Sequence, residues 1–407
     1  METRKLTSQQ ELLESDRTIA TAFLHPWDED EARRTTQEQA EGKRPRPEQS
    51  WGLFGNDGAM LASAACLQRT LTLGGDTLPA GEVHMVGSLP ERRGAGSVRA
   101  LMGAMLRDFK ECGDALAVLI PFSCAFYRKF GFEIAARMVC QRLEIEQLAD
   151  YACDCDVTRV WEEKDLAPVR ALWEAHARSH DLAELRKDEA WVWLGNGDFG
   201  EPDFLHPDRQ RYTYVLWDDG EAVAYVRFSF FHEPENPFVG ELNVHDLVFT
   251  SPSSLHAALG FLYRMRAKVS HLNFTLPDVD FATLVPASDK VEQRLDSHVM
   301  ARLLDPARIL RQMPQPYGTG SYVLGIEDEF LPEVAGRWKV EFSDGRATCV
   351  KPTDLEPDLM AKETAACMLL LGRMGLADAL LRTDVSLRGN EDVLSRVFVR
   401  RPIHLAL

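Results

Sequence analysis

A basic, glycine-rich turn in the first third of the chain joins an apolar strand pattern to an amphipathic helix pattern. Its residues run Val83-His84-Met85-Val86-Gly87-Ser88-Leu89-Pro90-Glu91-Arg92-Arg93-Gly94-Ala95-Gly96-Ser97-Val98. Gly94 and Gly96 let the backbone come close to a ligand, the first helical N–H groups have no partner within the helix, and the helix dipole favours negative charge there. Arg92 and Arg93 can add ionic contacts at the rim. The segment predicts a pyrophosphate site, beside the alternative of an ordinary strand-to-helix connection.

The segments around this turn argue against two other phosphate-binding motifs. The turn lacks the G-x-x-x-x-G-K-[ST] sequence of a P-loop. Upstream, residues 51–54 and 59–73 flank Asn56-Asp57-Gly58, which favours a hairpin, and a third strand is expected from Glu82 to about Ser88. This antiparallel start is unlike a parallel dinucleotide-binding unit. After the turn, apolar residues at helical spacing predict a helix packed on one face: Val98, Leu101, Met102, Met105, Leu106 and Phe109.

The rest of the first 150 residues completes a mixed α/β pattern. Residues 115–120 read as a buried strand, and a short helix is expected around residues 126–132. The chain begins with an amphipathic helical segment, and a polar, proline-containing stretch from Asp28 to Gln49 predicts a long loop. The helical segment carries Leu12, Leu13, Ile19, Phe23 and Leu24.

A similar order of elements returns between about 156 and 285, without the glycine-rich turn. Residues 166–176 are expected to be helical, residues 212–217 and 222–231 flank an Asp-Asp-Gly turn, and residues 241–249 predict another strand. A helical segment at 253–266 follows where the first half has its turn and helix. The pattern indicates a duplicated domain whose second copy has lost the anion-binding turn.

The pattern changes from about residue 290. Strands are expected near 321–326 and 337–342, and Thr353-x-x-Glu356 predicts the capping-box start of a helix. That helix would carry Leu359, Met360, Cys367, Leu370 and Leu371. We therefore expect an α/β (α+β) protein with domains at 1–150, 151–288 and 289–407.

Composition bears on partners and location. The net charge of −17 argues against nucleic acid or an anionic membrane, which select for clustered Lys and Arg, and suits a cationic amine better. The eight cysteines lack the spacing of a zinc site or a disulfide framework, so Cys153-x-Cys155 reads as incidental thiols and no metal is expected. The first residues contain no apolar signal region, which favours a cytoplasmic location.

Two motifs resemble those of a known superfamily. Pro90-x-x-Arg93-x-x-Gly96-x-Val98 is similar to the R-x-x-G-x-[GA] acetyl-CoA signature of the GNAT acetyltransferases, and Phe126-Tyr127-Arg128-Lys129-Phe130-Gly131-Phe132 sits where that fold places the short helix after its fifth strand. The length, the degenerate second half, the segment 300–305 and the final domain resemble the enhanced intracellular survival (Eis) acetyltransferases. The resemblance implies two tandem GNAT-like domains, a domain like sterol carrier proteins, and a homo-hexamer.

The resemblance also assigns roles to individual residues. The strand before the turn is expected to hold pantetheine and the acetyl group through the backbone of Val86, Gly87 and Ser88. The pyrophosphate falls on the turn itself, at Arg92, Arg93, Gly94, Ala95, Gly96, Ser97 and Val98. Tyr127 matches the family's general acid, since a phenol stays protonated at neutral pH. The family's general base is the C-terminal carboxylate, here on Leu407, where the family usually has an aromatic residue.

Other residues are rival or additional candidates. Glu82 and His84 alternate with apolar neighbours and are rival bases that could face the cleft. Trp27, Asp28 and Asp30, with Glu31 beside them, are candidates for an acidic rim that attracts an amine, and a solvated charge run is an equal alternative.

Together these observations predict an acetyl-CoA-dependent N-acetyltransferase that acts on primary amines. Aminoglycosides or lysine-like amines are implied as acceptors by the resemblance alone. A sequential mechanism is expected because no Cys or Ser lies in an evident nucleophile motif. Two alternatives are a protein or peptide acceptor and a non-catalytic regulatory protein that binds acyl-CoA or lipid.

Overall fold

The structure is a computed structural model that describes residues 1–40, 49–94, 96–188, 191, 210–233, 236–276 and 280–405. Its contacts divide the chain into two compact units, each described here by itself. The first contains Met1–Ala136 and His298–Leu405, and the second contains Arg137–Ser297. The predicted mixed α/β class is confirmed by the helices and sheets of both units.

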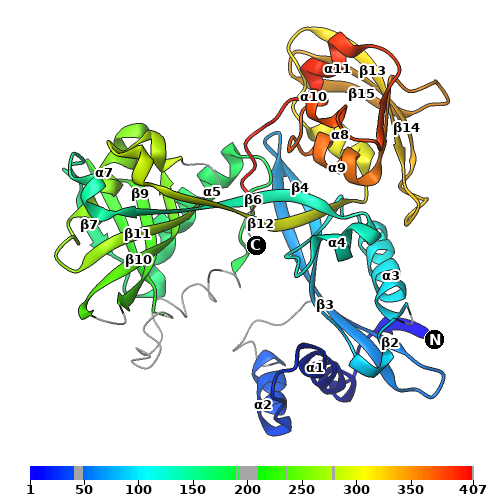
Figure 1. Cartoon of the computed structure of the whole chain (residues 1–407), viewed down its shortest axis with the longest axis horizontal. Coiled ribbons are helices and arrows are strands. Elements are labelled where there is room, and N and C mark those ends of the chain that lie inside the picture. Colours follow the sequence, from blue (N-terminus) through cyan, green and yellow to red (C-terminus); the bar gives the residue numbers. More distant parts are fainter. Residues whose placement is uncertain are drawn as a thin grey trace. The chain divides into compact units, whose positions relative to one another are not determined.

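The first 136 residues form a sheet with helices beside it (Figure 1). In this unit the strand order is β1-β2-β3-β4-β5-β12, antiparallel except for the parallel pair of β4 and β5. The strands are β1 (Glu2–Lys5), β2 (Gln49–Phe54), β3 (Met60–Leu73), β4 (Asp76–Ser88), β5 (Leu116–Leu119) and the end of β12 (Glu292–Leu303). The helices are α1 (Gln9–Phe23), α2 (Glu29–Ala40), α3 (Ser97–Glu111) and α4 (Cys124–Tyr127).

Helix α3 packs as its apolar spacing predicts. Leu101, Met102, Met105, Leu106 and Phe109 are all buried. A Cβ at Gly81 would lie 2.5 Å from the ring of Phe109, so glycine at this position lets the ring pack directly on the backbone of β4. Helix α3 therefore covers the strand that leads into the glycine-rich turn.

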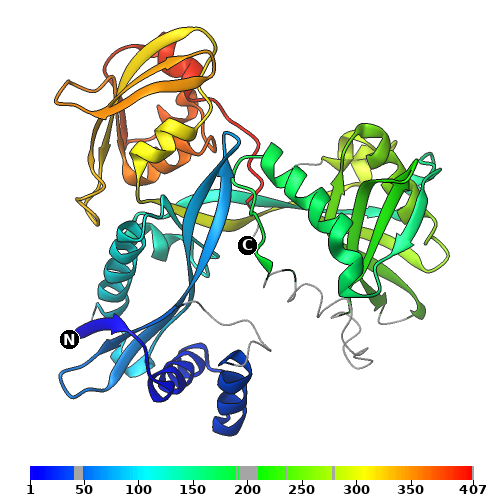
Figure 2. The ribbon, with the colours of Figure 1, turned by 180° about the vertical axis from the view of Figure 1, so that it is seen from behind.

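The predicted loop from Asp28 to Gln49 is wrong over much of its length, because helix α2 occupies Glu29–Ala40. Asp28 caps the helix by accepting a hydrogen bond from the Glu31 backbone N–H at 2.8 Å, and Arg33 pairs with Glu29 at 2.6 Å one turn apart. The segment is rich in helix formers but has no apolar stripe, so periodicity could not reveal it. Helices α1 and α2 lie side by side in both views (Figure 1 and Figure 2).

Two further differences concern strands. Strand β4 begins at Asp76, earlier than the predicted Glu82, because Pro79 and Gly81 lower the strand propensity of a segment that still pairs with β3. Strand β1 was not predicted, since the sequence Glu2-Thr3-Arg4-Lys5 is charged and lies at the edge of the sheet.

The second unit repeats the predicted order of elements. Its strands run β6-β11-β10-β9-β8-β7, and β10 and β11 are parallel as β4 and β5 are. The strands are β6 (Glu133–Glu144), β7 (Asp156–Arg159), β8 (Tyr212–Asp218), β9 (Glu221–Glu233), β10 (Asn236–Phe249) and β11 (Val269–Leu276). Helix α5 (Ala167–Ser179) precedes β8, and α7 (Pro252–Tyr263) connects β10 to β11 as α3 connects β4 to β5.

The C-terminal part of the first unit, drawn in orange and red in Figure 1, has its own five-stranded sheet of order β15-β14-β13-β16-β17. The strands are β13 (Thr319–Glu327), β14 (Gly336–Ser343), β15 (Arg346–Pro352), β16 (Leu359–Lys362) and β17 (Val385–Leu387). The helices are α8 (Pro306–Gln312), α9 (Glu363–Leu370), α10 (Leu376–Ala379) and α11 (Glu391–Val397).

The predicted capping box at Thr353 is wrong. The Thr353 hydroxyl accepts a hydrogen bond from the Leu355 N–H in a turn, and the Glu356 carboxylate pairs with Arg337 and Arg388. The following residues form strand β16, and the helix begins only at Glu363. Pro357 restricts Glu356 to an extended backbone, which ends the motif before a helix can start.

Across the described ranges, none of the helices has the length and hydropathy needed to span a membrane. Those ranges also contain no cluster of three or more His, Cys, Asp or Glu side chains arranged to bind a metal ion.

Candidate active site

Strand β4 separates from β5 within the first unit. The two strands share the parallel pairs Ala80–Leu116, Gly81–Ala117 and Glu82–Val118, and in the described chain no pair with β5 follows Glu82. Strand β5 ends at Leu119, close to Pro121, which has no N–H to donate to a ladder. The β5-facing backbone edge of residues 83–88 therefore has no partner from β5 among the described residues, although backbone polar groups require partners.

A β-bulge lies in the separated part of β4. Ser63 pairs with Gly87 and Ala65 pairs with His84, so β4 carries one more residue than β3 across this step. Met85 takes up the extra length at a φ of 52°, a left-handed conformation that non-glycine residues rarely adopt. The bulge changes the direction of Val86, Gly87 and Ser88 relative to the paired half of the strand.

Gly87 is also required for packing. A Cβ there would lie 2.9 Å from the Cβ of Ala22, so helix α1 lies directly against the backbone of β4. One face of the predicted pantetheine strand is thus covered by α1.

The glycine-rich turn has the conformation that an anion site needs. Gly94 and Gly96 have φ values of 86° and 78°, and a Cβ at either residue would meet nothing within 4 Å. Gly96 is the N-cap residue of α3 and provides no side-chain cap. Ser97 is 4% exposed, and its hydroxyl has no hydrogen-bond partner among the described residues. An uncapped helix end with an unpartnered buried hydroxyl fits an anionic ligand such as a pyrophosphate.

The flanking residues of the turn differ in their contacts. Arg93 donates from Nη2 to the carbonyl oxygen of Ala22 at 2.9 Å, which ties the turn to the end of α1. Arg92 is exposed and forms no side-chain hydrogen bond or ion pair within the described ranges. Val98 is half-buried in the first turn of α3, and Ala95 lies outside the described residues.

Tyr127 is the last residue of α4, which follows β5. The Ser123 hydroxyl caps this helix by accepting a hydrogen bond from the Phe126 N–H. The phenol ring packs edge-on against Phe122, Phe126 and Phe132, with ring centroids 5.5, 5.2 and 6.1 Å away. The Tyr127 side chain is buried, and burial raises the pKa of its hydroxyl to about 12. Its hydroxyl has no hydrogen-bond partner in the described chain, so it is available as a neutral proton donor.

The rival bases have different environments. Glu82 is buried, and its carboxylate pairs with Arg69 of β3 at 2.6 Å. His84 is half-exposed, with Nδ1 3.8 Å from Oε1 of Glu82. Because the Glu82 carboxylate is already partnered, it has a structural role that does not depend on a substrate.

The predicted acidic rim is the first turn of α2. Asp28 is its cap, and Asp30 and Glu31 are exposed beside the N-terminus, where acidic side chains interact favourably with the helix dipole. Trp27 is half-buried, with the Arg17 guanidinium 5.6 Å from its ring centroid. These contacts give the residues a local structural role, and their role in substrate binding stays a prediction.

The predicted general base, the carboxylate of Leu407, lies outside the described residues, as does Ala406. The preceding segment is firmly packed. Arg401 donates its backbone N–H to the carbonyl oxygen of Gly372 at 2.8 Å and Nη2 to that of Leu370 at 2.9 Å. His404 and Leu405, the last described residues, are buried.

The second unit provides an internal comparison. There β10 stays paired with β11 as far as Val244, directly before a bulge between Val244 and Asp246. Helix α7, the counterpart of α3, is capped by Ser251, whose hydroxyl accepts from the Ser254 N–H at 3.2 Å. The Ser254 hydroxyl in turn accepts from the backbone N–H groups of Thr250 and Ser251. Side chains of the chain itself occupy the helix end that α3 leaves free.

Family models match all three parts of the chain. An acetyltransferase (GNAT) domain model matches residues 2–135, a second one matches residues 184–309, and a sterol carrier protein domain model matches residues 307–406. The structure is similar to that of Eis1 from Mycobacterium abscessus, with a TM-score of 0.79 and 20% sequence identity. The similarity covers 100% of this chain and 99% of the Eis1 chain. The chain is a GNAT N-acetyltransferase whose fold is that of Eis1. The predicted order of two GNAT-like domains and a sterol-carrier-like domain is confirmed.

Other proteins are similar to this chain. It is 29% identical over 335 residues to an uncharacterized N-acetyltransferase of Streptomyces avermitilis, covering 75% of this chain and 76% of that protein. An uncharacterized N-acetyltransferase of Streptomyces coelicolor is 26% identical over 339 residues, or 76% of each chain. A GCN5-related N-acetyltransferase from Anabaena variabilis has a TM-score of 0.83 at 16% identity, covering 99% and 98% of the two chains.

Two features of this candidate site were not predicted from the sequence. Ser123 had a detectable signal, because a serine three residues before Phe126 is a typical N-cap. Met85 had none, since nothing in its side chain favours a positive φ.

We expect the Tyr127 hydroxyl of this N-acetyltransferase to be almost fully protonated at pH 10, where an ordinary tyrosine with a pKa of about 10 is half ionised. Because the folded pKa lies above the unfolded one, this group stabilises the fold below pH 10 and the contribution is lost as the pH rises toward 12. The phenolate absorbance of native wild type minus native Tyr127→Phe at pH 10 should therefore be close to zero. The same difference measured in denaturant should show the missing phenolate, and a native difference as large as the denatured one would contradict the expectation.

Proposed function

We propose that this protein transfers the acetyl group of acetyl-CoA to a primary amine, and that the coenzyme binds in the first domain. The observation that carries the proposal is the separation of β4 from β5 beside the uncapped N-terminus of α3, where the buried Ser97 hydroxyl has no partner among the described residues. The second unit has the same topology, but its helix end is capped by Ser251. This contrast supports a coenzyme site in the first domain.

The residues present fit the coenzyme. The backbone of Val86, Gly87 and Ser88 would bind the pantetheine arm along the edge that β5 leaves free, and the turn from Arg92 to Val98 would bind the pyrophosphate. When bound, acetyl-CoA supplies an acetyl group activated as a thioester. Gly94 and Gly96 have positive φ values and open space around them, so no side chain would obstruct a phosphate that approaches the backbone N–H groups of this turn.

The protein's own groups would manage two protons. The Tyr127 hydroxyl, kept neutral by burial, donates its proton from Oη to the departing sulfur. The carboxylate of Leu407 accepts the proton of the attacking amine, in a sequential reaction with both substrates bound. Glu82 is a weaker candidate for this role because Arg69 already binds its carboxylate.

The acceptor and the assembly follow from the Eis resemblance and from charge. A net charge of −17 favours a cationic small molecule over nucleic acid or an anionic membrane surface, and aminoglycosides or lysine-like amines are the proposed acceptors. Trp27, Asp28, Asp30 and His84 are the proposed acceptor contacts. A cytoplasmic homo-hexamer is the proposed assembly.

Acetyl-CoA should raise the midpoint of thermal unfolding, because a ligand that binds only the native state stabilises it by about 2.7 kcal/mol at a hundredfold excess over Kd. Gly96→Glu should abolish this shift by placing bulk and negative charge at the helix end. Gly58→Glu is the matched control, since Gly58 also has a positive φ of 80° and open space around it but lies in the turn between β2 and β3. An undiminished shift in Gly96→Glu would place the coenzyme elsewhere.

Tyr127→Phe should bind acetyl-CoA normally but lose about 10²-fold to 10⁴-fold in turnover, the range typical of general acid catalysis. Thiol release with a panel of amines measures the rate, and the thermal shift measures binding. A variant with wild-type turnover would leave Tyr127 with a packing role only.

Amidation of the Leu407 carboxylate by semisynthesis should cripple turnover while leaving the fold and the coenzyme-induced thermal shift intact. The amide removes the negative charge and adds almost no volume, so it separates the charge from the crowding that added residues would cause. Leu407→Phe is the control, because it keeps the carboxylate and should remain active. Wild-type turnover of the amide at neutral pH would exclude the carboxylate as the base and direct attention to His84.

A further inference from the structure

The turn that follows Tyr127 contacts the C-terminal domain at several points. Phe130 packs against Phe330, with ring centroids 5.4 Å apart. Gly131 has a φ of 79°, and a Cβ there would lie 2.2 Å from Nη1 of Arg302, so this glycine makes room for the Arg302 guanidinium. Arg302 forms a fully buried ion pair with Asp328, which follows β13. The segment after the predicted general acid is thus fitted onto the C-terminal domain.

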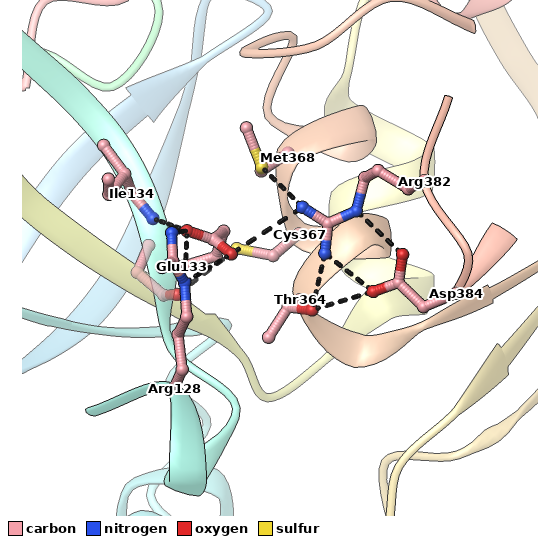
Figure 3. A network of polar contacts seen from close by, with 9 residues as sticks. Arg128, Glu133, Ile134, Thr364, Cys367, Met368, Arg382 and Asp384 are labelled. Atoms are coloured by element: carbon pink, nitrogen blue, oxygen red, sulfur yellow. Dashed lines mark hydrogen bonds and ion pairs between the residues drawn. The ribbon is translucent and has the colours of Figure 1, made fainter. Parts of the chain in front are cut away.

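Glu133 is the central group of a charged network at this boundary (Figure 3). Its side chain is 3% exposed, and Arg128 binds it with Nη2 at 2.7 Å from Oε1 and Nε at 3.0 Å from Oε2. The Ile134 N–H also donates to Oε1 at 2.9 Å. Arg128 directly follows Tyr127, so the carboxylate of Glu133 fixes the residue next to the predicted general acid.

A second arginine reaches Glu133 from the C-terminal domain. Nη1 of Arg382 lies 3.8 Å from Oε2 of Glu133. Asp384 orients the Arg382 guanidinium through two hydrogen bonds, from Nε at 2.8 Å and from Nη2 at 2.6 Å, and the Thr364 hydroxyl accepts a third at 3.2 Å. The fixed fork of the guanidinium leaves Nη1, which donates to the Met368 sulfur at 3.8 Å and forms the ion pair with Glu133.

We infer that Arg382 is a positioning residue for the general acid: through Glu133 and Arg128 it fixes the helical turn that ends in Tyr127. A carboxylate as buried as that of Glu133 needs compensating positive charge, and Arg128 is itself half-exposed. Arg382 supplies the second charge from a different domain. The inference rests on the proposed function, since it gives the C-terminal domain a task in the same transfer reaction.

Catalytic geometry sets the size of the expected effect. A displacement of about 1 Å at a reacting group can lower a rate by about 10²-fold. Arg382→Gln should therefore lower kcat by about 10-fold to 100-fold, with KM for acetyl-CoA changed by less than about twofold. Arg382→Lys retains the positive charge and should recover part of kcat. Arg388→Gln is the matched control, because Arg388 lies in the same domain but pairs with the exposed Glu356, and it should keep the wild-type kcat.

A double-mutant cycle separates positioning from general damage. If Arg382 acts through Tyr127, then Arg382→Gln should lower kcat by less than about twofold in the Tyr127→Phe background, because the group that it positions is already absent. An equal loss in both backgrounds, or a wild-type kcat for Arg382→Gln, would overturn the positioning role alone. Wild-type turnover of Tyr127→Phe would overturn the acid assignment in the proposed function and the positioning role with it.

Should Arg382→Gln fail to fold, the cycle is run with Thr364→Val and Arg382→Lys. Thr364→Val removes the hydrogen bond that the guanidinium donates to the Thr364 hydroxyl and the one that this hydroxyl donates to Asp384 at 3.4 Å, and it leaves every charge in place. We expect each variant to lower kcat by less than the loss of about 10-fold to 100-fold expected for Arg382→Gln, and only in the background that contains Tyr127. Wild-type kcat in both variants would overturn the inference.

Discussion

Strand β4 pairs with β5 only from Ala80 to Glu82. The rest of the candidate site depends on the path of the backbone after this last pair. Backbone polar groups of the following residues have to be satisfied by something other than a neighbouring strand. The bulge at Met85 turns the strand, and the glycine-rich turn then directs the uncapped end of α3 toward the same region. In the proposed function, this single departure from regular pairing would provide both a backbone edge and a helix end for one extended, anionic ligand.

The second unit shows that this topology alone does not make a site. Its β10, α7 and β11 repeat the order of β4, α3 and β5, including a bulge in the first strand. The difference lies in a few residues. Ser251 and Ser254 satisfy the N-terminal end of α7, whereas the end of α3 has no side-chain cap. The strands differ less, because among the described residues β10 also has no pair with β11 after Val244. In the proposed function, local hydrogen bonding at the helix end therefore distinguishes the two domains on a shared fold.

The sequence predicted those features whose signal is local. The apolar spacing of α3, the Asn-Asp-Gly turn between β2 and β3, and the glycine-rich turn before α3 each follow from the residues concerned. Helix α2 was missed because a polar helix has no stripe of apolar residues along one face. The helix predicted from Thr353 was wrong because Pro357 directly follows the capping motif. The contact of Glu133 with Arg382 could not be predicted, since no local pattern indicates which charges meet across a domain boundary.

Buried charges explain why the C-terminal domain matters for the first domain. Arg302 and Asp328 are fully buried, and two of the Arg302 nitrogens, Nε and Nη1, have no hydrogen-bond partner among the described residues. Such a pair contributes little net stability, because the cost of desolvating both charges offsets their attraction. It is, however, intolerant of misalignment, since either charge alone would be buried without a partner. The buried Glu133 carboxylate is likewise intolerant of misalignment, because it would lose the positive charges of Arg128 and Arg382. Both pairs involve the turn after Tyr127, because Arg302 lies against Gly131 and Glu133 binds Arg128. In the proposed function they would hold this turn in place, and a general acid requires a fixed position.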